Sequence, residues 1–275
     1  MKDSWKSGDP YEYFMGRWSS LVVQGFLDWL SPGHGLKWLD VGCGPGALSE
    51  AAMLGFGPEN LIAIDQSEGF VLTAQRRLGS KAICKLGNAI DLPIEDCSVD
   101  LTVSGLVLNF IPDVGSTLAE MKRVTADGGM VVIYVWDYAG KMDFLQKFWE
   151  AAAELRSEAS ALSEANRFSD CGSEALVESF TEAGFDQVMT APVEIDTHFA
   201  DFDDYWEPFF GGQGPAPTYL MSLSKTERER LRDLVYERLP IQRSGSIPLS
   251  ARALAVKGIV PADCSRLSVQ IESAF

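Results

Sequence analysis

The chain has 275 residues and a formal net charge of −16 at pH 7, with no basic stripe that would offset this charge. Such an acidic surface repels phosphate backbones and anionic membranes, so we expect neither nucleic acid nor a lipid surface as a partner. The five cysteines are odd in number and widely spaced, which disfavours a disulfide framework and a zinc site and is typical of a cytoplasmic protein. The apolar runs are shorter than the ~18 residues that a membrane span needs.

Residues 1–35 predict a helical cap segment. Between residues 11 and 30 the aromatic side chains are too dense for a solvated arm, so we expect this helix to pack on the domain or to cover its cleft. Tyr13 is therefore a candidate for contact with a substrate. His34 lies in the turn SPGHG, where an exposed loop position is the favoured interpretation.

Residues 36–137 alternate short apolar runs with amphipathic segments, which is the pattern of repeated βα units around a parallel sheet. Asp127-Gly128-Gly129 is typical of a helix stop followed by a turn. Right-handed crossovers would place a ligand at the carboxyl edge of the strands. The predicted strands are 36–41, 60–65, 81–87, 99–106 and 129–136, and the predicted helices are 47–54, 68–78 and 113–124.

Residues 138–260 predict further helices, two more strands and an inserted substrate cap. Residues 141–183 are predicted to be helical with a polar break at SEASALSEANRFSD, and residues 186–197 and 248–259 are the two strands. Between these strands lie the aromatic segment FADFDDYWEPFF, the flexible loop GGQGPAP and the charged helix SKTERERLRDLVYERL. The tail, residues 261–275, shows no pattern.

The segment LDVGCGPGALSE, residues 39–50, places Gly42, Gly44 and Gly46 between an apolar run and a predicted helix. A strand that ends on alternating glycines lets a ligand lie against bare backbone. The same spacing satisfies the nicotinamide fingerprint G-x-G-x-x-G/A, because Ala47 occupies its last position. The glycines alone therefore leave two classes of cofactor open.

Three further features bear on the choice of cofactor. Asp40 places a carboxylate at the strand end, where it suits an ammonium group better than a pyrophosphate. Asp65 ends the next strand about 20 residues past the glycines, where a carboxylate can accept two ribose hydroxyls in either class. Asn88 and Ala89 follow the third strand, where an amide side chain and a backbone N–H can meet an adenine edge.

Between residues 36 and 137 these motifs occur together: Asp40-x-Gly42-x-Gly44-x-Gly46, the strand-end Asp65, Gly87-Asn88-Ala89 with Asp91-Leu92-Pro93, and FIPD after Leu108. The combination resembles class I S-adenosylmethionine (SAM)-dependent methyltransferases, in the branch of ubiquinone and menaquinone C-methyltransferases and many small-molecule methyltransferases. The N-terminal YEYFMGRWS is similar to a segment of uncharacterised bacterial members. The resemblance implies an α/β, Rossmann-like, seven-stranded and mostly parallel sheet whose last strand is antiparallel, with helices on both faces.

The resemblance also implies SAM as the cofactor, with S-adenosylhomocysteine (SAH) as its product. Asp40 would meet the methionyl amino group, Asp65 the ribose, and Asn88, where the family often has Asp, the adenine. Arg17, a cation in an apolar segment, is a candidate for the cofactor carboxylate, and a surface arginine is an equally good interpretation. The other expected contacts come from Gly42, Cys43, Gly44, Gly46, Gln66, Ala89, Ile90 and Leu106.

Candidates on the acceptor side are fewer. Asn109 follows the fourth strand and either orients an acceptor or caps the next helix. Trp136 ends the fifth strand and, like Trp206 and Phe210 in the aromatic segment, either contacts an apolar acceptor or packs in the core. His198 is a candidate general base, although some acceptors need none.

We therefore predict a cytoplasmic methyltransferase that moves a methyl group from SAM to a small molecule by in-line displacement, without a metal. The sequence shows no nucleophile–base dyad, and none is required, because the cofactor brings an activated electrophile. VLNF stands where an Asn-Pro-Pro-aromatic motif would mark amide or base nitrogens as acceptors. Two alternatives stay open: a nicotinamide-dependent oxidoreductase and a non-catalytic SAM-binding protein. The sequence carries no signal for the oligomeric state.

Overall fold

The computed structural model describes residues 12–168, 171–211 and 214–262, and only the backbone of residues 12 and 13. The chain divides into two compact units. The first unit comprises the segment up to Ser31 together with Tyr134–Gly172 and Ala191–Ala255. The second unit comprises Pro32–Ile133, Ser173–Thr190 and the segment from Val256 onward. We describe each unit by itself.

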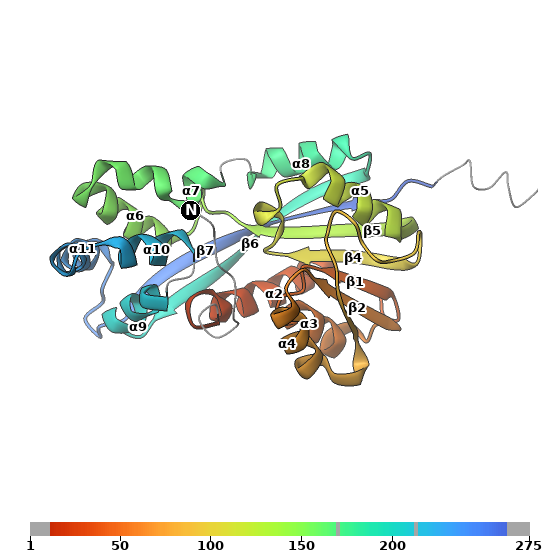
Figure 1. The fold of residues 1–275 in the computed structure, drawn as a ribbon, viewed down its shortest axis with the longest axis horizontal. Coiled ribbons are helices and arrows are strands. Elements are labelled where there is room, and N and C mark those ends of the chain that lie inside the picture. The colour runs from red at the N-terminus through yellow and green to blue at the C-terminus, as the bar shows by residue number, and fades with distance from the viewer. Residues whose placement is uncertain (1–11, 169–170, 212–213, 263–275) are drawn as a thin grey trace, which may run out of the picture. The chain divides into compact units, whose positions relative to one another are not determined.

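A seven-stranded sheet has the order β3-β2-β1-β4-β5-β7-β6 (Figure 1). Parallel pairing joins β1 to β2 and β4, and β2 to β3. Such central parallel strands are buried on both faces, as the burial of β1, β2 and β4 shows. The strands of the sheet are β1 (Lys37–Val41), β2 (Asn60–Asp65), β3 (Ile83–Leu86), β4 (Val99–Gly105), β5 (Thr125–Trp136), β6 (Asp186–Phe199) and β7 (Ile247–Ile259).

The last strand, β7, runs antiparallel to β5. Gly128 N donates to Val260 O, and Val260 N donates to Gly129 O, both at 2.9 Å. Just past the end of β5 the partner lies earlier in the sequence, since Asp137 N donates to Arg252 O at 2.9 Å. The predicted fold class, including the antiparallel last strand, is therefore confirmed.

Four helices flank the sheet of the second unit, α3 and α4 on one face and α5 and α8 on the other (Figure 1). Side-chain caps start two of them: Ser67 Oγ accepts from Phe70 N in α4, and Asp113 Oδ1 accepts from Ser116 N in α5. Such caps satisfy N–H groups that a helix leaves unpaired at its start. Their bounds are α3 (Ala47–Phe56), α4 (Glu68–Leu78), α5 (Val114–Val124) and α8 (Ser173–Glu182).

The helices of the first unit surround an aromatic core. Phe148 stacks on Phe209 with ring centroids 4.6 Å apart, and Tyr205 donates its hydroxyl to Phe144 O at 2.6 Å. All four side chains are buried. The helical elements are η1 (Glu12–Gly16), α2 (Arg17–Leu30), α6 (Asp143–Leu155), η4 (Ser157–Leu162), α7 (Glu164–Arg167), α9 (Phe202–Trp206), η6 (Glu207–Gly211), α10 (Pro215–Ser222) and α11 (Lys225–Arg238).

Two local predictions are wrong and a third is refined. The turn expected at Asp127-Gly128-Gly129 is part of β5, because Gly128 and Gly129 pair with Val260, which directly follows β7. The predicted polar break does follow α6, and it holds the short helices η4 and α7, the latter capped by Ser163. The end of the loop GGQGPAP is the first turn of α10, where Pro215 fits because a first-turn residue needs no N–H partner.

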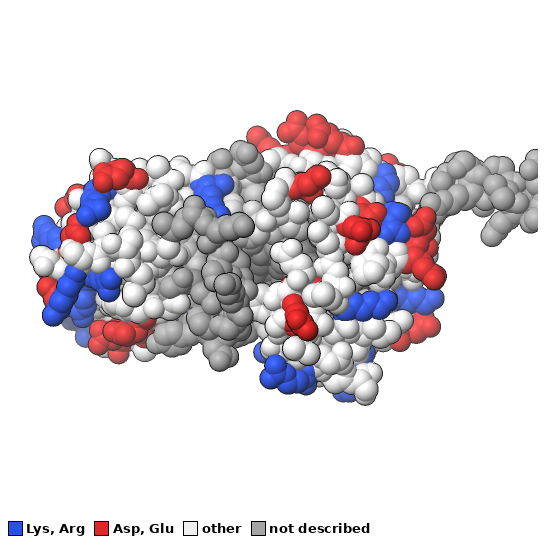
Figure 2. Space-filling model, in the orientation of Figure 1, with Lys and Arg blue, Asp and Glu red and all other residues white. Residues whose placement is uncertain are grey.

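No helix among the described residues is both long enough and apolar enough to cross a membrane. On the face shown in Figure 2, the described Lys and Arg side chains are scattered among Asp and Glu and form no continuous basic stripe. The predicted tail and Cys264 lie largely outside the described residues.

Candidate functional site

The glycine segment forms a tight turn where β1 ends. The N–H groups of Gly42 and Cys43 both donate to Ile64 O, at 2.7 and 2.9 Å, which fixes the turn against the end of β2. Gly42 and Gly44 have φ angles of +74° and +52°. L side chains rarely adopt such angles, so the alternating glycines allow this path of the backbone.

The two glycines differ in their surroundings. A Cβ on Gly42 would lie 2.7 and 2.8 Å from the methyl carbons of Val107, so packing excludes a side chain there. A Cβ on Gly44 would meet no heavy atom within 4 Å. The backbone at Gly44 therefore borders open space that a ligand can enter.

Asp40, two residues before this turn, is a buried carboxylate with 1% exposure. Its Oδ2 accepts the hydroxyl of Ser49 in α3 at 2.7 Å, whereas its Oδ1 has no hydrogen-bond partner among the described residues. Burial raises the pKa of Asp40 to about 7, against the opposing hydrogen bond from Ser49. An unpaired buried carboxylate oxygen is unfavourable, and a cationic N–H donor would satisfy it.

Asp65 ends β2 on the other side of the glycine turn. Its Oδ2 accepts Gly44 N at 2.9 Å, and its Oδ1 accepts Ser67 N at 2.8 Å. Burial raises the pKa of Asp65, and the backbone N–H donors oppose that shift. Each carboxylate oxygen keeps capacity for a further donor, so Asp65 can hold the glycine turn and still accept hydroxyl groups.

Asn88 and its neighbours form a second turn beyond β3. Asn88 Oδ1 accepts Ile90 N at 3.3 Å, and Asn88 O accepts Asp91 N at 3.1 Å. Gly87 N donates to Asp65 O at 3.0 Å, which ties the start of this turn to the end of β2. Asn88 is exposed and Ala89 half-buried, so both can meet a ligand.

These two turns border one pocket of about 270 Å³ at the carboxyl ends of β1 and β2. Its volume is near the lower end of ordinary ligand pockets. Six of the predicted cofactor residues line it, namely Gly42, Asp65, Gln66, Asn88, Ala89 and Ile90. The structure therefore brings together predicted cofactor residues that lie up to 48 positions apart in the sequence, from Gly42 to Ile90.

The segment after β4 supplies the rest of the wall, and sequence reasoning missed most of it. Val107, Phe110, Ile111, Pro112 and Asp113 line the pocket. The motif FIPD, residues 110–113, was part of the family resemblance, so it was the signal that could have found Phe110 to Asp113 but not Val107.

Leu106 and Asn109 carry two local irregularities in this segment. Leu106 has a φ of +60°, a left-handed conformation that costs a non-glycine residue about 1–2 kcal/mol. Asn109, in η3 (Leu108–Phe110), has both side-chain Nδ2 and Oδ1 buried without a hydrogen-bond partner among the described residues. Strained backbone and unpaired buried polar atoms of this kind are typical of ligand sites.

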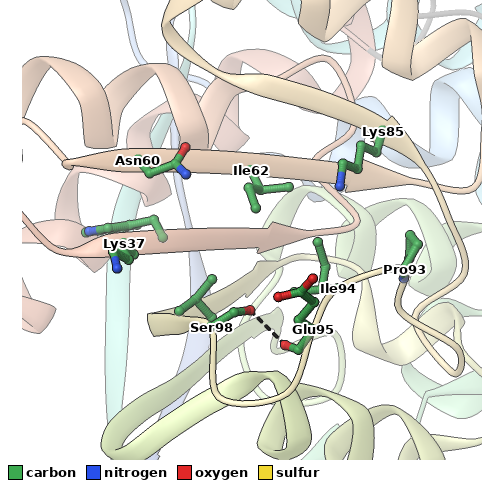
Figure 3. A pocket seen from close by; sticks show the side chains of 10 residues that line it. Lys37, Asn60, Ile62, Lys85, Pro93, Ile94, Glu95 and Ser98 are labelled. Atoms are coloured by element: carbon green, nitrogen blue, oxygen red, sulfur yellow. Dashed lines mark hydrogen bonds between the residues drawn. The ribbon is translucent and has the colours of Figure 1, made fainter.

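A second pocket, of about 300 Å³, lies at the amino ends of β1 and β2 (Figure 3). Lys37 and Asn60 start those strands, and Pro93, Ile94 and Glu95 face them from the segment between β3 and β4. None of the predicted cofactor residues lines this pocket. It lies at the opposite strand ends from the pocket of the glycine turn.

Two candidates, Arg17 and His198, belong to the first unit. The guanidinium of Arg17 donates to Asp204 Oδ1 at 2.8 Å and lies over the rings of Trp18 and Phe199. A cofactor carboxylate would have to compete with Asp204 for it. His198 is exposed on β6, and its role as a base stays a prediction.

The aromatic candidates also belong to the first unit. Trp136 and Trp206 are 2% and 3% exposed, as expected of core packing, whereas Phe210 is 40% exposed. Their contact with an acceptor stays a prediction. The side chain of Tyr13 lies outside the described residues.

Two other features of the chain concern reactivity and metals. Cys43 is buried in the glycine turn, and burial raises the pKa of its thiol, which makes it a poor nucleophile. His34 is exposed, and its Nδ1 lies 2.8 Å from Phe56 O. In the described part of the chain, no group of three or more His, Cys, Asp or Glu residues is placed to hold a metal ion.

Comparison with known proteins agrees with this geometry. A methyltransferase-domain profile matches residues 39–133. A demethylmenaquinone methyltransferase of Staphylococcus aureus is 34% identical over an alignment of 165 positions, and the match covers 55% of this chain and 68% of that protein.

Solved structures show the same fold at low sequence identity. A putative methyltransferase from Bacillus halodurans has a TM-score of 0.57 at 16% identity, over 86% of this chain and 98% of its own. Phosphoethanolamine N-methyltransferase 2 of Haemonchus contortus, with phosphomonomethylethanolamine and SAH bound, has a TM-score of 0.56 at 16% identity, over 92% of this chain and 57% of its own.

The matches decide between the two cofactors that the glycine spacing leaves open. They support SAM, and the nicotinamide interpretation is no longer needed. The chain belongs to the class I SAM-dependent methyltransferases, in the menaquinone methyltransferase-like branch.

Proposed function

We propose that this SAM-dependent methyltransferase acts on a small-molecule acceptor and binds the adenosine part of SAM in the pocket beside Asp65. The observation that carries the acceptor class is the 34% identity to a demethylmenaquinone methyltransferase, an enzyme named for a small organic acceptor. The net charge of −16 also disfavours nucleic acid.

The chain's own groups fit the parts of SAM. The unpaired Oδ1 of Asp40 suits an ammonium group, the free capacity of Asp65 suits ribose hydroxyls, and the open space beside Gly44 admits a ligand against the backbone. Asn88 and Ala89, on the turn that closes the pocket, suit an adenine edge. Each charged or polar part of SAM is thus matched to a group of the chain with the opposite charge or a complementary hydrogen-bonding pattern.

On the acceptor side we assign an orienting role to Asn109. Its amide offers one acceptor and two donors, and neither end has a partner among the described residues. An amide stays neutral over the physiological pH range, so Asn109 can orient a hydroxyl, carbonyl or amine but cannot take up its proton. The chemistry suits an acceptor that carries such a polar group close to the methylated atom.

When bound, SAM supplies a methyl group already activated on a sulfonium. The chain then has to hold the acceptor in line with that methyl group and keep water away. The apolar side chains of Val107, Phe110 and Ile111 form one wall of the pocket and would keep water from that side of the bound adenosine.

The two glycines of the turn give a paired prediction. Gly42→Ala should lower the free energy of unfolding by about 2–4 kcal/mol, because a clash with Val107 adds to the left-handed penalty. Gly44→Ala should cost only about 1–2 kcal/mol, because its Cβ enters open space, and should instead weaken SAH binding. Urea unfolding and calorimetry would measure both quantities; equal losses of stability would contradict the distinction.

The acceptor class is tested with methyl-labelled SAM. We expect label in small organic molecules from a panel of quinols, phenols and amines, and none in RNA or protein fractions. Asn109→Leu should raise the KM for the acceptor at least about tenfold, the effect of one lost polar contact, with the Kd for SAH unchanged. Label found only in RNA or protein would overturn the proposal.

A further inference from the structure

We propose that Arg123, together with Glu120, is a positioning residue that sets the adenine side of the cofactor pocket. The inference rests on the proposed placement of adenosine beside Asn88. It concerns a residue pair on α5 that does not line the pocket and whose charges do not face the ligand.

Arg123 lies in the last turn of α5, and its guanidinium directs its donors at the segment that follows the Asn88 turn. All five of its hydrogen bonds are charge-assisted or go to backbone carbonyls, a geometry that the planar fork of arginine suits. The acceptors are Leu92 O at 3.0 Å, Ile94 O at 2.9 Å, Asp96 Oδ1 at 2.7 Å, Glu120 Oε1 at 2.7 Å and Glu120 Oε2 at 2.7 Å.

Glu120 completes the arrangement. Its Oε2 accepts Leu92 N at 2.8 Å, so the pair holds both the N–H and the carbonyl of Leu92. The hydrogen bond from Arg123 lowers the pKa of Glu120, and the hydrogen bond to Glu120 raises the pKa of Arg123. Both groups therefore stay ionised at physiological pH, and their hydrogen bonds to Leu92 do not change with pH in that range.

The segment needs this attachment because the sheet supports it only in part. Leu92 and Ile94 are buried, yet a pocket of about 300 Å³ is lined by Pro93 and Glu95 of this segment and by Ile62 and Lys85 of the strands (Figure 3). Packing against the strands is therefore incomplete on that side of the segment. Arg123 supplies contacts that fix its position from α5 instead.

The same helix also defines the facing wall of the cofactor pocket. Pro112 and Asp113, which precede α5, line that pocket, and Asp113 caps the helix. Asn88 and Ile90, which precede the attached segment, line the pocket as well. The helix α5 is thus connected to one wall through Asp113 and to the other through Arg123 and Glu120. The Arg123–Glu120 pair therefore sets the distance between the two walls and preorganises the space for an adenine.

The test uses the full chain with Arg123→Met and the milder Arg123→Lys. We expect the calorimetric Kd for SAH and for adenosine alone to rise by the same factor, about tenfold for Met and about threefold for Lys, because only the adenine end is affected. Hydrogen exchange of the unliganded protein should speed up at residues 88–92 and stay unchanged at residues 37–41. The matched control, Arg156→Met, removes an ion pair with Glu227 in the first unit and should change neither readout.

Each outcome decides the matter. A folded Arg123→Met that binds adenosine as the parent does would overturn the positioning role, and so would faster exchange spread evenly over the second unit. If Arg123→Met fails to fold, the Lys variant gives the same comparison. A parent that binds neither SAH nor adenosine would instead defeat the proposed placement of adenosine.

Discussion

Replacing Asp65 by alanine is expected to raise the Kd for SAH by at least about 100-fold. Two hydrogen bonds from ribose hydroxyls to a carboxylate contribute roughly 1.5–3 kcal/mol each, and every 1.4 kcal/mol is about a tenfold change. Asp65 also holds Gly44 N and Ser67 N, so its removal loosens the glycine turn as well. Isothermal calorimetry measures the loss directly.

Asp100→Ala is the matched control for this change. Asp100 also accepts a backbone N–H, from Lys37 at 2.8 Å, but at the amino end of β1. It should leave the Kd for SAH within about twofold of the parent, because it does not line the pocket. Equal losses in the two variants would show that the effect of Asp65→Ala is general destabilisation rather than lost contact with ribose.

The second large effect is a pH dependence of SAH binding through Asp40. Burial raises the pKa of this carboxyl to about 7, so below pH 7 it is mostly protonated and must lose a proton to receive an ammonium group. Binding should therefore weaken as pH falls through 7, approaching about tenfold per pH unit, and level off above 7. From pH 8 to pH 6 the expected loss of affinity is about tenfold.

Two variants and one further measurement test this origin. Asp40→Asn should bind weakly and without the pH dependence, because an amide does not titrate. Ser49→Ala removes the hydrogen bond that lowers the pKa of Asp40, so the midpoint should move to higher pH. Calorimetry in buffers of different ionisation enthalpy should show proton release near pH 6 that disappears by pH 8; a flat profile in the parent would contradict the role of Asp40.

Much of the fold could be predicted from the sequence because its signals are local. The βα alternation placed β1 to β5 with small errors at their ends, and the predicted starts of the helices at residues 68 and 113 agree with α4 and α5 to within one residue. The glycine turn and Asp65 were recognisable because few backbones other than a ligand turn need alternating glycines.

The rest of the site could not be predicted because its signals are not local. Val107 is an apolar residue after a strand and lies outside the FIPD motif, and nothing in its sequence separates a pocket wall from a core. Arg123 has the position of an ordinary basic residue in the last turn of a helix. Three of its five side-chain hydrogen bonds go to residues 27 to 31 positions earlier in the chain, and two go to Glu120 in its own helix. All five form only in the folded chain.

The left-handed Leu106 has a consequence for engineering. Glycine at this position would relieve the left-handed backbone, while it would also raise the entropy of the unfolded chain and remove a half-buried side chain. Any gain in stability would be made at a residue that connects β4 to η3, the short helix that contains Asn109. Stabilisation of this enzyme should therefore begin elsewhere, and position 106 is where greater heat resistance and turnover of the acceptor are expected to oppose each other.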